Sequence, residues 1–287
     1  MRKTYFLLLL GSLATAACSD DKYVVDVYST MRYDALALPT TADTMTLQTV
    51  DFVSASEGFV GGDDGALFAT TDAGQTWVAR PRGQFGTFYK LAFSSATTGW
   101  AGTDAGLCRT TDGGRSWRLV PTYDWRGSLS GTVYDVQFVT PQVGYAVGHG
   151  GTINKTTNGG QSWTSMQNRI DKRATFRAVS FTSADSGSVV GGDLSHWQTT
   201  DGGRTWTYTD YSGRPDAEPY YDVLRYGADD YLLAAPDGFR AYKPESLGYY
   251  DEADEDFNYA VRGLARAGMV DIERCAEAIR PAKRGRI

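Results

Sequence analysis

The sequence predicts an all-β fold, a β-propeller of five four-stranded antiparallel blades, followed by a short C-terminal helical segment. The first observation behind this prediction is a phrase, Thr-Thr-Asp/Asn-x-Gly-x-Thr/Ser-Trp, that occurs four times. Its closing tryptophans are 40, 46 and 43 residues apart, a period that fits one propeller blade of four short strands. The second observation is that apolar and polar residues alternate with a period of two between the phrases, as they do in β-strands.

Each repeat opens with an apolar strand, continues through a polar turn into a glycine-led strand, and then runs through a third strand into the phrase. The opening strands centre on Val50, Leu91, Val136 and Val179, and the glycine-led strands begin at Gly58, Gly99, Gly144 and Gly187. A fourth strand follows each closing tryptophan. The order of strands and turns therefore predicts a four-stranded meander in every repeat.

The residues of the phrase suit a tight turn between the third and fourth strands. An Asp or Asn side-chain oxygen can accept hydrogen bonds from nearby backbone amides, and glycine adopts positive φ without steric cost. Asn158 would serve such a turn but would be a poor carboxylate catalyst, so we predict a structural role for the phrase. The residues assigned this role are Asp72, Gly74, Trp77, Asp112, Gly114, Trp117, Asn158, Gly160, Trp163, Asp201, Gly203 and Trp206.

The phrase resembles the Asp-box, or BNR, motif. The longer unit, of which "GYAVGHGGTINKTTNGGQSW" is the clearest copy, resembles the repeats of the photosystem II assembly and stability factor family. The resemblance covers about residues 45–243 and implies that the Asp-box is structural. Because the same box occurs in sialidases and in β-glucan-cleaving hydrolases, the box alone does not decide the function.

A fifth repeat without an Asp-box is predicted from three strand-like stretches, residues 222–226, 231–235 and 236–242. Near the N-terminus, residues 31–39 ("MRYDALALP") resemble the outermost strand that follows a boxed tryptophan. Since a propeller must cover its exposed strand edges, we expect residues 31–39 to complete the last blade. The predicted propeller domain therefore spans residues 31–243.

The N-terminus has the layout of a secretory signal and resembles that of bacterial lipoproteins. Arg2 and Lys3 precede an apolar stretch that is too short to remain as a spanning helix, and Thr15-Ala16-Ala17 precede Cys18 in a lipobox-like order. We predict a signal peptide at residues 1–17, lipidation of Cys18, and a tether at residues 18–30; the alternative is a secreted protein without a lipid. Loss of Arg2 and Lys3 lowers the formal charge from −6 by two, to −8.

The predicted location is the bacterial outer membrane, with the protein held by its lipid. The acidic residues Asp20 and Asp21 after Cys18 resemble a signal for export to the outer face of that membrane. The alternative is that they only solvate the tether, and the sequence leaves the leaflet open. The membrane is expected to be contacted through the anchor alone.

The C-terminal segment, residues 244–287, departs from the repeat pattern. An acidic run is followed by apolar residues on one helical face, from Val261 to Ile279, and by a basic end. This segment could dock on the propeller or bind a partner, or it could be what remains of a truncated sequence.

Charge and composition exclude several classes of function. A formal charge of −6 argues against a general nucleic-acid binder. Besides Cys18 the chain has only Cys108 and Cys275, and its two histidines, His149 and His196, lie at no metal-ligand spacing from either. We therefore predict no metal site and no cofactor.

The candidate ligand face is the one opposite the Asp-boxes, because in a meander the connections between blades lie at the other end of the strands. Arginines and aromatic residues gather in these connections, and such groups suit carboxylates, sugars and peptides, although they could also be ordinary polar loops. The candidate residues are Arg82, Phe85, Tyr123, Trp125, Arg126, Arg173, Tyr211 and Arg214; Arg80 and Tyr220 are expected on the same face.

The favoured function is a non-catalytic, envelope-anchored scaffold that uses this face to bind an envelope or cell-surface protein. One alternative is a surface carbohydrate-binding module, for which the ligand would be a glycan. The other is a glycoside hydrolase, sialidase-like or β-glucan-cleaving, which would need two facing carboxylates or an arginine cluster beside a tyrosine nucleophile. No residue is assigned a catalytic role.

Overall fold

The computed structural model describes residues 46–124, 127–166, 175–191, 195–210, 220–225, 231–235, 238–242 and 250–251. All of them belong to one compact unit, residues 37–264. Their regular secondary structure consists of β-strands and one 3-10 turn, Asp63–Gly65. Within these residues no helix has the length and apolar character needed to span a membrane.

The strands form five four-stranded sheets. The first contains β1 (Leu47–Phe52), β2 (Gly58–Gly62), β3 (Leu67–Thr70) and β4 (Val78–Ala79). The second contains β5 (Phe88–Phe93), β6 (Gly99–Thr103), β7 (Gly106–Thr110) and β8 (Arg118–Leu119). The third contains β9 (Val133–Phe138), β10 (Gly144–Gly148), β11 (Ile153–Thr156) and β12 (Thr164–Ser165). The fourth contains β13 (Phe176–Phe181), β14 (Gly187–Gly191), β15 (Ser195–Thr199) and β16 (Thr207–Asp210). The fifth contains β17 (Asp222–Arg225), β18 (Tyr231–Ala235), β19 (Gly238–Tyr242) and β20 (Tyr250–Asp251).

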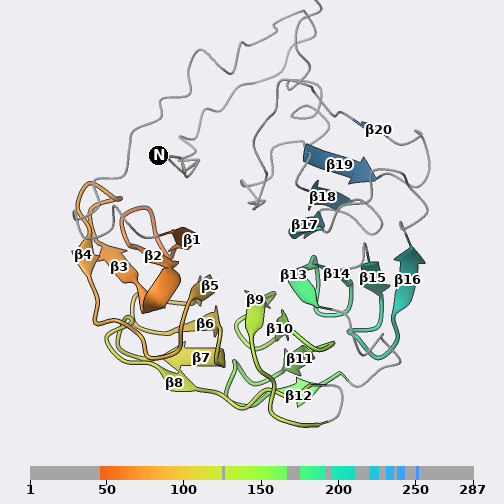
Figure 1. Ribbon diagram of the computed structural model, residues 1–287, viewed down its shortest axis with the longest axis horizontal. Helices are drawn as coiled ribbons and strands as arrows, with labels where there is room; N and C mark the ends of the chain where they lie inside the picture. The colour runs from red at the N-terminus through yellow and green to blue at the C-terminus, as the bar shows by residue number, and fades with distance from the viewer. Residues whose placement is uncertain are drawn as a thin grey trace, which may run out of the picture. The chain divides into compact units, whose positions relative to one another are not determined.

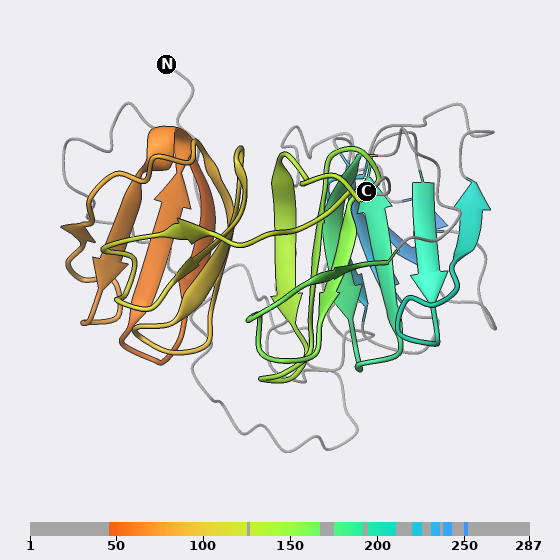
Figure 2. The same cartoon turned by 90° about the horizontal axis from the view of Figure 1, so that it is seen from below.

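The sheets follow one another in chain order around a common centre (Figure 1). The first strand of each sheet faces this centre and contacts the first strand of the next sheet, as β1 does with β5 and β9 with β13. Every strand pair is antiparallel, so the turns fall at two opposite ends of the strands (Figure 2). The predicted all-β class and the four-stranded antiparallel unit are confirmed.

The fifth sheet corrects one expectation. Its outer strand is β20, in which Tyr250 pairs with Ala241 and Asp251 with Arg240. We expected residues 31–39 in this place; they lie outside the described residues, as do the predicted signal, the tether and most of segment 244–287. A strand joined to β19 by the short connection 243–249 loses less loop-closure entropy than one recruited from the far end of the chain. The fifth sheet therefore extends beyond the predicted boundary at residue 243.

Aromatic pairs hold neighbouring sheets together. The second residue of β2 stacks on the last residue of β5, with the rings of Phe59 and Phe93 3.7 Å apart and nearly parallel. The same positions in the third and fourth sheets hold Tyr145 and Phe181, whose rings are 3.6 Å apart. Stacked rings of this kind add about 1 kcal/mol to the free energy gained from burial alone.

Between the fourth and fifth sheets a polar contact replaces this stack. Ser188 occupies the position of Tyr145, and Arg225 occupies the position of Phe181. The guanidinium of Arg225 is buried and donates from Nη1 to Ser188 Oγ at 3.1 Å and to the carbonyl oxygen of Gly187 at 2.9 Å. The fifth sheet is therefore attached by hydrogen bonds where the others are attached by rings.

Candidate functional site

The two ends of the strands carry different turns. Each Asp-box is bonded to the first turn of its own sheet; for example, Gly113 N donates to Thr97 O at 2.9 Å and Gly202 N to Asp185 O at 2.8 Å. This end is called the box end. At the opposite end, called the loop end, the second turn of a sheet is hydrogen-bonded to the connection that precedes the sheet. For example, Ala105 N donates to Phe85 O at 3.2 Å.

At the box end, the side-chain oxygens of the boxed residues are engaged within the turn. Asp112 Oδ1 accepts from Thr110 Oγ1 at 2.8 Å and from Ser116 N at 2.9 Å, while Oδ2 accepts from Ser116 Oγ at 2.6 Å. These hydrogen bonds, first among them that of the Ser116 hydroxyl, lower the pKa of Asp112 to about 2. Both oxygens of this carboxylate are therefore used within its own turn, as a structural role requires.

Asn158 makes the equivalent set of bonds without a charge. Its Oδ1 accepts from Thr156 Oγ1 at 2.9 Å and from Ser162 N at 3.0 Å, and its Nδ2 donates to Ser162 Oγ at 2.8 Å. Only the direction of the bond to the serine hydroxyl is reversed. The turn therefore needs an oxygen and a second polar atom at this position, and either Asp or Asn supplies them.

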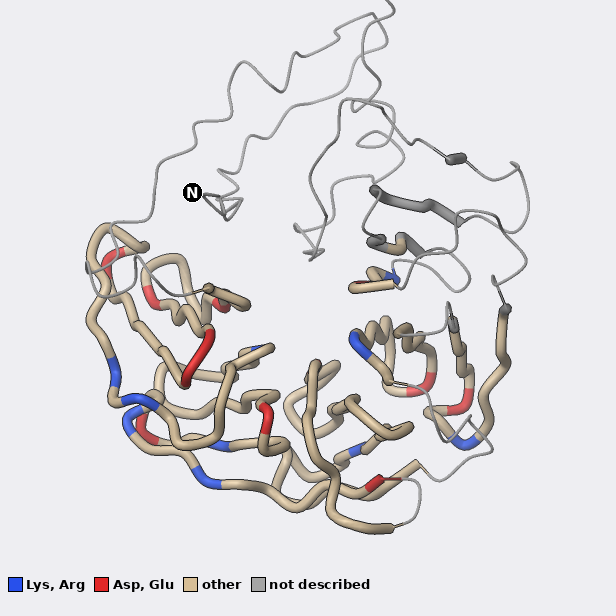
Figure 3. The backbone as a smooth tube through the Cα atoms, in the orientation of Figure 1, with Lys and Arg blue, Asp and Glu red and all other residues tan. Residues whose placement is uncertain are grey.

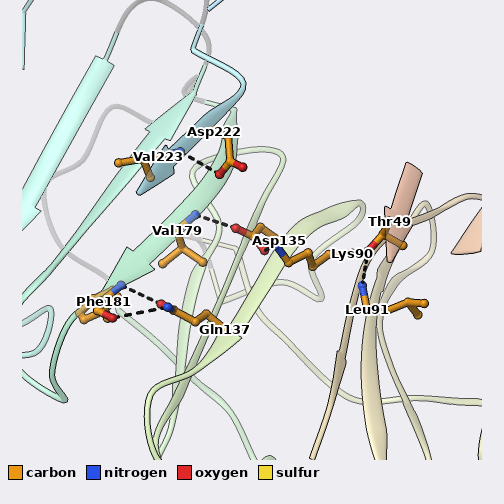
Figure 4. Close-up of polar contacts among 9 residues, drawn as sticks. All are labelled: Thr49, Lys90, Leu91, Asp135, Gln137, Val179, Phe181, Asp222 and Val223. Carbon is orange, nitrogen blue, oxygen red and sulfur yellow. Dashed lines mark hydrogen bonds and ion pairs between the residues drawn. The ribbon is translucent and has the colours of Figure 1, made fainter. Parts of the chain in front are cut away.

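The first strand of each sheet is an edge strand, so some of its backbone N–H groups have no partner within the sheet. Side chains of the preceding sheet accept hydrogen bonds from several of these groups (Figure 4). Thr49 Oγ1 accepts from Leu91 N at 3.0 Å. Asp135 Oδ2 accepts from Val179 N at 2.8 Å, and Gln137 Oε1 from Phe181 N at 2.7 Å. Polar residues on the first strands thus connect successive sheets.

Lys90 interrupts this pattern between the second and third sheets. It occupies the strand position of Thr49 and Asp135 but cannot accept a hydrogen bond, and its Nζ lies 3.6 Å from Asp135 Oδ1 instead (Figure 4). The charge of Asp135 raises the pKa of Lys90 against the opposing effect of burial, and Asp222 and Asp51 raise it further. Lys90 is therefore charged, and an ion pair links these two sheets.

Beside these contacts between first strands, the residues at one aligned position of successive first strands form a continuous row of aromatic and cationic side chains. The row, called the inner-rim arc, consists of Tyr89, Tyr134, Arg177 and Tyr221, on four successive sheets. The rings of Tyr89 and Tyr134 are 5.0 Å apart, edge to face. The guanidinium carbon of Arg177 lies 5.5 Å from the ring centre of Tyr134 and 5.7 Å from that of Tyr221.

The inner-rim arc lies at the loop end. Each of its residues is at the beginning of a first strand or directly before it, where the chain arrives from the preceding sheet. The hydroxyl of Tyr89 donates to Asp104 Oδ1 at 2.7 Å, and Asp104 belongs to the second turn of its sheet. Burial, followed by this hydrogen bond and the Asp104 charge, raises the pKa of Tyr89 to about 12. This end of the arc is therefore a neutral phenol fixed in one orientation.

Arg177 is the exposed member of the arc, and the three tyrosines are half-buried. Its guanidinium makes no ion pair with any carboxylate in the part of the chain that the structure describes. The two flanking rings hold it through cation–π contacts, which limit the side-chain entropy that binding would cost. An oriented, uncompensated guanidinium between tyrosines is suited to receive a carboxylate, and Tyr and Arg are enriched among residues that dominate protein–protein binding.

The predicted candidate ligand face is only partly described. Arg82 is exposed, and Phe85 is half-buried against the core residues of the first two sheets. Tyr123 is bound into the fold through its backbone, which forms two hydrogen bonds with the side chain of Asn154. The five other residues lie outside the described residues; they are Trp125, Arg126, Arg173, Tyr211 and Arg214.

Two further expectations for this face were wrong. Arg80 directs its side chain to the box end, where Nε donates to Gly113 O at 3.2 Å, because it follows the boxed tryptophan by only three residues. Tyr220 is fully buried and packs with Val190 and Val223 in the core between the fourth and fifth sheets. Neither side chain belongs to the loop-end surface.

The inner-rim arc was not among the predicted site residues. The prediction rested on arginines and aromatics in the loops, whereas the arc arises from one position that recurs at the start of each first strand. Aligning the repeats on their opening strands places Tyr89, Tyr134, Arg177 and Tyr221 in one column. An alignment of the repeats on their opening strands could therefore have revealed the inner-rim arc.

Comparison with known proteins agrees with the repeat pattern. A family model described as photosynthesis system II assembly factor YCF48 matches residues 25–125 and 124–230. The chain belongs to the YCF48 family. The resemblance to photosystem II assembly factors, stated from the repeats, is confirmed.

Solved structures of the YCF48 family share the fold. A structure of YCF48 bound to a D1 peptide has a TM-score of 0.56 at 20% identity, over 73% of this chain and 66% of that one. YCF48 from Cyanidioschyzon merolae has a TM-score of 0.55 at 20% identity, over 74% and 70% of the two chains. An ancestral GH74 enzyme has a TM-score of 0.57 at 16% identity, but the match covers only 30% of that enzyme.

A short stretch also matches a metabolic enzyme. Thirty residues are 77% identical to 2-isopropylmalate synthase of a Bradyrhizobium strain and 70% identical to that of a Rhodopseudomonas palustris strain. The stretch covers 10% of this chain and 6% of each of these curated relatives. A match of this length shows no relationship of fold or activity for the YCF48-family chain as a whole.

Proposed function

We propose that this chain is a non-catalytic scaffold that binds a protein partner at the loop end, with the inner-rim arc as its recognition surface. The observation that carries the proposal is Arg177, exposed between Tyr134 and Tyr221 and without a carboxylate of its own among the described residues. Membership of an assembly-factor family supports the proposal, as does a family member solved with a bound peptide. The photosynthetic role of the family is not part of it.

The ligand that fits is an extended segment carrying a carboxylate. The guanidinium would bind this carboxylate, and the tyrosine rings would pack against neighbouring apolar or aromatic groups. A glycoside hydrolase would instead need two carboxyl groups facing one bond. On the first strands, Asp51 and Asp135 accept hydrogen bonds from backbone amides of the next sheet. The likeness to a GH74 enzyme concerns the fold alone.

The Arg177→Gln substitution tests the recognition. Pairs of labelled peptides that differ only in one central residue, Glu or Gln, would be titrated by fluorescence polarisation. The unchanged chain is expected to prefer the Glu member of its best pair about tenfold, because a charge-assisted hydrogen bond is worth about 1.5–3 kcal/mol. The Arg177→Gln variant should lose the preference. Arg204→Gln, at the box end, is the matched control, and equal loss in both variants would contradict the proposal.

We further propose that a lipid on Cys18 holds the scaffold at the bacterial outer membrane. The expectation rests on the charged, apolar and small-residue order of the first eighteen residues. The Cys18→Ser variant should move from the membrane fraction to the soluble fraction of cells, as followed by immunoblotting. Cys275→Ser serves as the control and should stay with the membranes. Retention of Cys18→Ser in the membrane fraction would contradict the anchor.

A further inference from the structure

We propose that Arg80 and Arg115, at the box end of the second sheet, form a binding site for a phosphate-type oxyanion. These two residues, called the arginine pair, come from different sheets and meet on one turn. Arg80 Nε donates to Gly113 O at 3.2 Å, and Arg115 Nη1 donates to Asp112 O at 2.8 Å. The site is separate from the inner-rim arc, which lies at the loop end.

Among the described residues, the arginine pair uses few of its hydrogen-bond donors. Each guanidinium has five N–H donors in a planar fork, and each uses one of them to bind a carbonyl oxygen of the box. Because the two carbonyls belong to consecutive residues, the guanidiniums are held close together. Two arginine forks directed at the same region match the several acceptor oxygens of a phosphate group.

The charge balance at this turn favours an added anion. The charge of Arg115 acts with burial, the larger effect, to lower the pKa of Arg80, so the two guanidiniums repel each other. Asp112 opposes this, but its carboxylate already accepts hydrogen bonds from Thr110 and Ser116. A bound oxyanion would remove the repulsion.

The fourth sheet provides an internal comparison. There Arg204 occupies the box position of Arg115, and Lys155 Nζ donates to Gly202 O at 3.1 Å, as Arg80 Nε does to Gly113 O. Asp185, in the first turn of that sheet, acts on Lys155 with a compensating charge. The second sheet has Thr97 at the position of Asp185 and so lacks this carboxylate. The fourth sheet therefore supplies its own negative charge beside its cations. In the second sheet a bound anion could supply it for the arginine pair.

The position of Arg80 is specific to this pair of sheets. The residues that correspond to it after the next two boxed tryptophans are Val120 and Met166, both apolar. Two more arginines, Arg109 and Arg118, are paired across β7 and β8 in the same sheet. Basic residues thus gather along the outer part of the first two sheets (Figure 3). This surface raises the local concentration of anions around the arginine pair.

Phosphate groups could reach this site from solution or from lipid head groups, and one experiment separates the sources. The full chain carrying Cys18→Ser, so that no acyl chain contributes, would be titrated with inorganic phosphate and pyrophosphate by calorimetry. It would also be sedimented with phosphatidylcholine vesicles with and without phosphatidylglycerol. We expect saturable binding to at least one probe. Binding to the phosphatidylglycerol vesicles alone would identify the lipid head group as the source.

Three variants decide whether the arginine pair is responsible. Arg80→Gln/Arg115→Gln should weaken binding at least tenfold. Thr97→Asp, which supplies the carboxylate found in the fourth sheet and keeps both arginines, should weaken it to a similar extent. Arg204→Gln removes an equal charge from the box of the fourth sheet and should stay within twofold of the unchanged chain. The proposal is wrong if no probe binds, or if Arg204→Gln weakens binding as much as the double substitution does.

Discussion

Replacing Gly160 with alanine is expected to lower the free energy of unfolding by about 3 kcal/mol. Gly160 has a φ of +73°, which costs an alanine about 1 kcal/mol. A Cβ at this position would also lie 2.6 Å from Cε2 of Trp100. The indole of Trp100 is buried and its ring centre is 4.3 Å from that of Phe138, so moving it adds about 2 kcal/mol of overpacking.

Two other glycines of the same sheet separate these contributions. Gly150 has a φ of +66°, and an added Cβ would have no atom within 4 Å, so Gly150→Ala should cost about 1 kcal/mol. Gly131 has neither a positive φ nor a close neighbour, so Gly131→Ala should be neutral or slightly stabilising. Urea unfolding of the three variants checks the order. Equal stability of Gly160→Ala and Gly131→Ala would contradict the packing of the boxed turn against Trp100.

Acidification is expected to destabilise the fold through His196. This side chain is fully buried on β15, and burial, followed by the charge of Arg225, lowers its pKa to about 3. In the unfolded chain the pKa is about 6.5. Below pH 6.5 the unfolded state therefore binds the proton and the folded state does not. The contribution of neutral His196 is complete above pH 6.5 and is lost as the pH falls, by up to about 1.4 kcal/mol per pH unit until about pH 3.

The His196→Gln variant isolates this effect. Between pH 6.5 and pH 4.5 its free energy of unfolding should fall less steeply than that of the unchanged chain. The unchanged chain should lose about 2–3 kcal/mol more than the variant over this range. His149→Gln, which removes the other imidazole from an exposed position, is the matched control. Parallel curves for His196→Gln and the unchanged chain would show that His196 is not held neutral by the fold.

The repeat unit could be predicted from sequence because its signals are local. The polar turn with Asp or Asn, a glycine at positive φ and the closing tryptophan keep the same order in every box and set the ends of the third and fourth strands. The strand β20 could not be predicted in this way. Its residues, Tyr250 and Asp251, lie in an acidic run without an alternating pattern. They pair with β19 because an open strand edge is close in the chain.

The candidate site was harder to predict because it depends on direction and register. The position of Arg80 after a strand predicts a place at the loop end, but its long side chain reaches back to the box of the next sheet. The sequence predicts a loop position for Tyr220, whose side chain is fully buried in the core. In contrast, Arg177 lies inside a strand pattern and looks unremarkable in the sequence. It becomes notable only when the first strands of neighbouring sheets are set side by side, with Tyr134 and Tyr221 on either side.

Site-specific photo-cross-linking in intact cells tests most directly whether the inner-rim arc contacts a protein partner. A benzophenone side chain in place of Tyr134 keeps an aromatic ring in the arc. The same group in place of Val78, exposed on the outer strand β4, is the control. We predict a discrete protein adduct from position 134 that disappears with Arg177→Gln, and no adduct from position 78. An adduct from position 78 alone, or one from position 134 that persists in the Arg177→Gln variant, would contradict the account.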